Sequence, residues 1–60
     1  MTVNVIIVRS YESDDRKAPW IPMVEIKGEW VSDKGYTTRK AALAWLSRWA
    51  TQRGVEINFV

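Results

Sequence analysis

The chain has 60 residues, a formal net charge of +2, and neither cysteine nor histidine. These absences exclude disulfide bonds, zinc sites of the Cys/His type, and nucleophilic catalysis by Ser–His or Cys–His pairs. The glycines do not form a phosphate-binding pattern, and the carboxylates lack metal-ligand spacing. We therefore predict one small non-enzymatic domain, 1–60, that has no cofactor and no metal. Its apolar runs are too short to span a bilayer, and a cytoplasmic protein is expected.

Alternating apolar residues predict a first strand over residues 2–11. Its two faces carry Val3, Val5 and Ile7 on one side and Ile6 and Val8 on the other. Apolar residues on both faces indicate an inner strand, or a strand whose second face a partner covers. The polar residues 12–19 that follow predict a loop.

A second strand is predicted over residues 20–26. Trp20, Val24 and Ile26 share one face of it. Because Pro19 and Pro22 have no N–H to donate, the beginning of this strand is expected at an edge or a bulge. Lys27-Gly28 then predicts a hairpin turn, and residues 29–32 predict a short third strand.

A helix is predicted over residues 38–53, with Thr37 or Thr38 as its N-cap and Gly54 as its stop. One apolar stripe joins Ala42, Trp45, Leu46 and Trp49. The alternation from residue 55 to residue 59 predicts a last strand, which we expect beside the first. The fold class is therefore α+β: a small antiparallel or mixed sheet with one helix packed on one face, in the order β-β-β-α-β.

Most of the basic side chains lie in predicted loops, in turns or at the helix start. They are Arg16, Lys17, Lys27, Lys34, Arg39 and Lys40. Together they are candidates for the rim of one end of the sheet, where they would bind phosphate groups of a nucleic acid. The alternative is an ordinary solvated surface.

A surplus of apolar residues forms the second candidate site. One helix covers only one face of a sheet, so the other face is expected to expose Ile6, Val8, Ile21, Met23 and Val31. Exposed apolar patches of a few hundred Å² or more are typical of interfaces. This pattern predicts a protein partner or a homodimer.

One stretch of the chain resembles a known family of DNA-binding domains. The run from Gly35 to Ala42 resembles the motif of the arm-type domains at the N-termini of phage and transposon tyrosine recombinases. The positions that match in order are Trp20, Gly28, Gly35, Tyr36, Thr38, Arg39, Lys40 and Ala42. The resemblance implies a three-stranded sheet backed by a helix, with the open face of the sheet in the DNA major groove.

The chain departs from that family pattern at two places. Ala41 stands where the family has the Glu of a capping box. Glu25 and Glu29 are expected on the face that would meet DNA, where they would repel phosphate. The first hypothesis is a nucleic-acid-binding module encoded by a phage or mobile element. The second is a protein-interaction or assembly module, such as a small modulator of a host protein or a homodimer.

Overall fold

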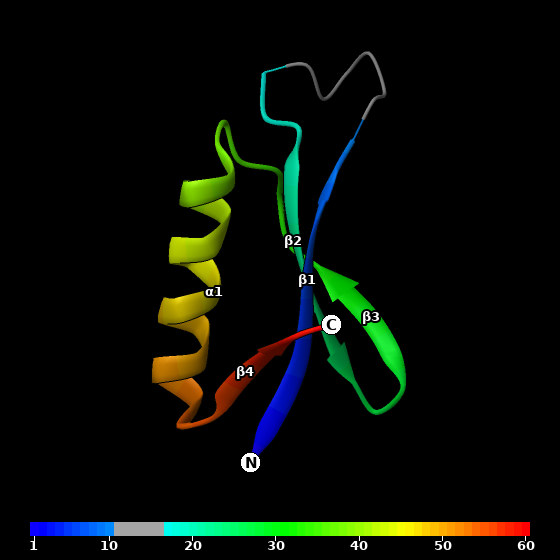
Figure 1. Cartoon of the computed structure of the whole chain (residues 1–60), viewed down its shortest axis with the longest axis vertical. Coiled ribbons are helices and arrows are strands. Elements are labelled where there is room, and N and C mark those ends of the chain that lie inside the picture. Colours follow the sequence, from blue (N-terminus) through cyan, green and yellow to red (C-terminus); the bar gives the residue numbers. More distant parts are fainter. Residues whose placement is uncertain (11–16) are drawn as a thin grey trace.

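The computed structural model describes residues 1–10 and 17–60. The elements in this part of the chain are β1 (Thr2–Arg9), β2 (Trp20–Ile26), β3 (Glu29–Ser32), α1 (Arg39–Arg53) and β4 (Glu56–Phe59). The strands form one mixed sheet, and α1 packs against one of its faces (Figure 1). The predicted α+β class and the order β-β-β-α-β are confirmed. Arg16 and most of the predicted loop at 12–19 lie outside the described residues.

The strand order in the sheet is β3-β2-β1-β4. β1 is an inner strand, antiparallel to β2 and parallel to β4. β4 pairs with residues 2–5 of β1 and β2 pairs with residues 5–9, so in the register the two neighbours flank different parts of β1. The prediction that the last strand returns beside the first is confirmed by the pairing of Val3 with Ile57.

A two-residue turn joins β2 to β3. Lys27 and Gly28 have φ angles of 53° and 80°. Two successive residues with positive φ are typical of the type I′ hairpin, whose twist matches that of the flanking strands. The turn places Ile26 opposite Glu29, so Val24 pairs with Val31. This register decides which face each β3 side chain occupies.

Pro22, the proline of β2, lies in an inner strand and not at an edge of the sheet. Pro22 pairs with Ile7 of β1, and on the other side β3 ends at Ser32. Pairing on that side resumes where Trp20 meets Tyr36. Between the Val24–Val31 and Trp20–Tyr36 pairs, three residues of β2 oppose four residues of the partner segment, which is a bulge. Pro22 lies at this interruption. The ladder has no bond there that would need an N–H from residue 22, so proline is tolerated.

The helix is capped at both ends by side-chain and backbone groups. The Thr38 hydroxyl accepts a hydrogen bond of 3.1 Å from the Ala41 N–H, which identifies Thr38 as the N-cap. Gly54 adopts the left-handed conformation, with φ 66°, and ends the helix. Both predicted boundaries are confirmed.

The core lies between α1 and the face of the sheet that it covers. Leu46 is fully buried, with Ala42 and Ala50 one turn away on either side. Across from them lie Val5 and Val24, also buried. α1 contacts β2, β4 and β1 but not β3, so β3 extends beyond the cover of the helix.

Candidate functional site

An apolar patch spans the two inner strands on the face of the sheet away from α1. Register places Ile6 beside Met23 and Val8 beside Ile21. The four side chains are partly buried by one another and by their neighbours in the sheet. None of the described elements lies over this face (Figure 1). These four residues of the predicted interface are thus brought together, and we call them the open-face patch.

A row of polar side chains borders the open-face patch. The Asn58 amide donates to the Asn4 side-chain oxygen at 3.1 Å, and the Asn4 amide donates to the Glu25 carboxylate at 3.1 Å. The polar row crosses β4, β1 and β2, so it limits the apolar area along one side. On β3 the exposed Trp30 stands opposite Glu25.

Val31 and Glu29 do not lie on the open face, contrary to the sequence prediction. Val31 pairs with Val24 and Glu29 pairs with Ile26, so both belong to the face that α1 covers. The physical reason is the two-residue turn. A strand running straight through Lys27 and Gly28 would keep residues 25 and 29 on one face, whereas the hairpin places residues 26 and 29 opposite each other.

The predicted basic rim is divided between two ends of the molecule. The segment 17–19 and the start of α1 lie at one end of the sheet, so Lys17, Arg39 and Lys40 are near that end (Figure 1). Lys27 is in the β2–β3 hairpin at the opposite end, on a molecule with a long axis of 36 Å. The Lys34 ammonium lies 5.5 Å from the centre of the Tyr36 ring. Lys27 therefore cannot share a binding site with the others.

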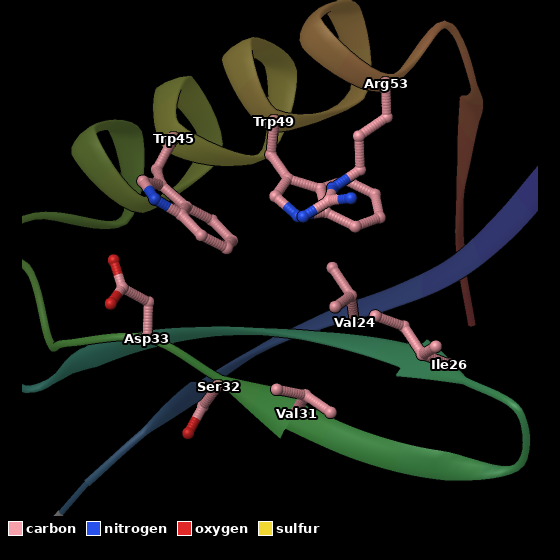
Figure 2. Close-up of a pocket in the computed structure, with 8 residues that line it drawn as sticks. All are labelled: Val24, Ile26, Val31, Ser32, Asp33, Trp45, Trp49 and Arg53. Atoms are coloured by element: carbon pink, nitrogen blue, oxygen red, sulfur yellow. The ribbon is translucent and has the colours of Figure 1, made fainter.

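Two tryptophans line a groove that the sequence analysis did not predict. The rings of Trp45 and Trp49 lie 6.5 Å apart with an angle of 28° between them. They overhang Val24, Ile26 and Val31 and enclose a groove of about 350 Å³ between α1 and the β2–β3 hairpin (Figure 2). The groove exists because β3 extends beyond the helix, which leaves part of both rings facing the groove.

The two ends of this groove carry opposite charges. Asp33 lies by Trp45 at one end, next to Ser32 (Figure 2). At the other end the Arg53 guanidinium lies over Trp49, 4.9 Å from the ring centre. The arrangement is an apolar slot with a negative end and a positive end.

A sequence signal for the groove was present in the spacing of the helix. The fully buried row, Ala42, Leu46 and Ala50, follows i, i+4 spacing, and Trp45 and Trp49 occupy the adjacent row. Residues at the margin of a buried stripe are only partly covered. Trp45 and Trp49 pack against the core, as their place in the apolar stripe predicts, and they also line the groove.

Comparison with known proteins adds no relative. No protein-family model, curated protein or solved structure matches the chain. The likeness to recombinase arm-type domains therefore stays a prediction. Within the described residues, no helix combines the length and the apolar character needed to cross a membrane.

Proposed function

We propose that this chain is an assembly module that associates with a second copy of itself through the open-face patch. The observation that carries the proposal is the continuous placement of Ile6, Val8, Ile21 and Met23 across the inner strands, with none of the described elements over them. Covering such a patch removes apolar surface from water, which drives association. A two-fold axis through the patch lets the same residues serve both partners.

The border of the patch supports association in one register. The hydrogen-bonded row of Asn58, Asn4 and Glu25 is polar and ordered. A partner that slid over this row would bury polar groups without partners, at a cost in free energy. The row therefore favours placement of the partner over the apolar residues alone.

Sedimentation of the purified chain from micromolar to millimolar concentration tests this proposal. We expect a monomer–dimer equilibrium that Met23→Lys weakens by about tenfold or more, because a charge at the centre of an apolar interface is costly to bury. Gln52→Lys is the matched control, since it adds the same charge on an exposed helix position. A strict monomer at every concentration, or equal effects of the two variants, contradicts the proposal.

Nucleic-acid binding is the second candidate function, and one observation favours it. Lys17, Arg39 and Lys40 are exposed at the same end of the fold. The resemblance to recombinase arm-type domains, and the phage or mobile-element origin it implies, support the same candidate. The open face is the less favourable surface for DNA, because Glu25 and Glu56 lie on it.

Measuring the affinity for duplex DNA at several salt concentrations distinguishes nucleic-acid binding from self-association. If the basic end binds duplex DNA, affinity falls steeply with salt. Replacing Arg39 and Lys40 by Gln then reduces the slope by about one unit for each phosphate that is no longer neutralised. The same variants leave the monomer–dimer equilibrium unchanged. Binding that does not depend on salt contradicts nucleic-acid recognition.

A further inference from the structure

The free edge of β3 and the tryptophan groove beside it form a second surface, distinct from the open-face patch. We infer that this surface binds an extended peptide segment of another protein, which adds a strand to β3 and places an aliphatic side chain in the groove. The segment carries a basic residue toward Asp33.

The backbone of β3 offers unpaired groups along its outer edge. Trp20 exchanges both backbone hydrogen bonds with Tyr36, so the even-numbered residues of β2 direct their N–H and C=O groups toward β3. Val31 and Glu29, which oppose residues 24 and 26, therefore bond to β2. Trp30 and Ser32 direct their N–H and C=O groups outward, where the described part of the chain has no further strand. Such an edge is a template for another extended chain.

Every second side chain of the added strand would point toward the side of the sheet where the groove lies. Side chains on the α1 side of that strand stand next to Val31, which is 47% exposed. From there an aliphatic side chain reaches Trp45 and Trp49, whose rings form the roof of the groove (Figure 2). Main-chain hydrogen bonds supply affinity in this mode of binding, and the pocket for the alternate side chain supplies specificity.

The acidic side chains of Asp33 and Glu29 select the order of residues in the segment. β3 runs from the Arg53 end to the Asp33 end. In a segment antiparallel to β3, the residue two positions before the aliphatic one stands opposite Asp33, where a basic side chain is favoured. The residue two positions after it stands opposite Glu29, where an acidic side chain is disfavoured. Both charged side chains are solvent-exposed, so they contribute to orientation more than to affinity.

A second copy of this chain fits the groove less well than such a segment. The side chains that β3 presents toward α1 alternate as Glu29, Val31 and then Asp33. This places an acid on both sides of the aliphatic residue. A paired copy would bring one of those acids against Asp33, where like charges repel. Charge complementarity thus favours a different protein as the occupant.

Isothermal titration with two capped peptides tests the inference. The probe is Thr-Lys-Thr-Val-Thr-Thr-Thr, and its twin has Glu in place of Lys. We expect the probe to bind about three- to fivefold more tightly than the twin, with a change in tryptophan emission, because the twin replaces an attractive exposed pair with Asp33 by a repulsive one. Asp33→Asn should remove the preference.

Two variants of β3 separate strand addition from other modes of binding. Ser32→Pro removes an outward N–H and leaves the bonds to β2 intact, so we expect a folded protein that has lost binding. Ser32→Ala is its control and should bind normally. Val31→Lys, at an exposed position, puts a charge beside the groove and should also abolish binding. This second variant tests the site even if Ser32→Pro does not fold.

Three results would overturn the inference. They are equal affinity for the two peptides, undiminished binding by Val31→Lys, and self-association that Val31→Lys abolishes, which would make a second copy the occupant. Met23→Lys, on the other face of the sheet, should leave peptide binding unchanged. Failure of this site is therefore distinguishable from failure of the open-face association.

Discussion

Trp20 and Tyr36 exchange both of their backbone hydrogen bonds, at 3.0 Å and 2.7 Å, although Tyr36 belongs to no strand. This single bridge fastens the connection between β3 and α1 to the beginning of β2. It thereby fixes where the helix starts and holds Gly35 against the segment before β2. The motif that resembles recombinase domains, Gly35-Tyr36, thus has a structural role that is independent of DNA.

Gly35→Ala is expected to destabilise the fold strongly. A methyl group on residue 35 would overlap with the carbonyl oxygen of Ala18, which is backbone and cannot swing away. We expect a loss of roughly 1–3 kcal/mol in the free energy of unfolding, measured by urea denaturation. Gly28→Asn is the control, because that site is open and Asn tolerates positive φ. Equal stability of the wild type and the Gly35 variant would show that the segment before β2 can move aside.

Thr38→Ala should cost more than Thr37→Ala. The Thr38 hydroxyl satisfies the Ala41 N–H, one of the free donors at the helix start. Loss of such a cap costs about 1 kcal/mol. The first turn of α1 has no acidic residue and carries Arg39 and Lys40, so the helix dipole offers no compensation. Thermal melts of the two variants followed by circular dichroism measure the difference, and the reverse order would place the cap at Thr37.

The local boundaries of the fold were predictable from the sequence because short-range chemistry sets them. Thr38, Gly54 and the Lys27-Gly28 turn each act on residues within one turn of the chain. The alternation of β1 also predicted both of its faces, including Ile6 and Val8 on the open side. These features depend on hydrogen bonds and steric limits that neighbouring residues alone supply.

The candidate sites were less predictable because they depend on how elements pair. Val31 was placed on the wrong face because the hairpin reverses the alternation at Lys27-Gly28. Pro22 indicated an edge or a bulge, and the structure has the bulge, which interrupts the ladder beside an inner strand. The helix spacing places Trp45 and Trp49 at the margin of the buried stripe, but the groove also needs β3 to extend beyond α1, which depends on how the strands pair.

The phenol of Tyr36 should titrate at higher pH than an ordinary tyrosine. Burial raises the pKa of Tyr36 above its usual 10.0, and Asp33 raises it further, while Arg48 lowers it in part. Absorbance of the phenolate in a Tyr11→Phe background, where Tyr36 is the only tyrosine, measures this pKa. Asp33→Asn should move the titration back toward lower pH, and Arg48→Gln should move it higher.

The raised pKa of Tyr36 determines how the free energy of unfolding changes with pH. The folded state holds the Tyr36 proton more tightly than the unfolded state does, so its contribution to stability is complete below about pH 10. That contribution is lost as the pH rises from the unfolded pKa through the folded one. We expect the urea midpoint of the wild type to fall through this alkaline range, and to fall less in Tyr36→Phe. A level midpoint in the wild type, or an equal fall in both proteins, would contradict the raised pKa of Tyr36.

Asn4→Ala should weaken the sheet more than Asn58→Ala. Asn4 lies in the middle of the polar row, where it accepts from Asn58 and donates to Glu25. Its removal breaks two hydrogen bonds, each worth roughly 0.5–1.5 kcal/mol, and the Glu25 bond is the stronger because its acceptor is charged. Asn58→Ala breaks only one, at an exposed position. Urea denaturation of both variants gives the comparison, and Asn58→Ala combined with Asn4→Ala should cost little more than Asn4→Ala alone, because the second substitution finds its bond already broken.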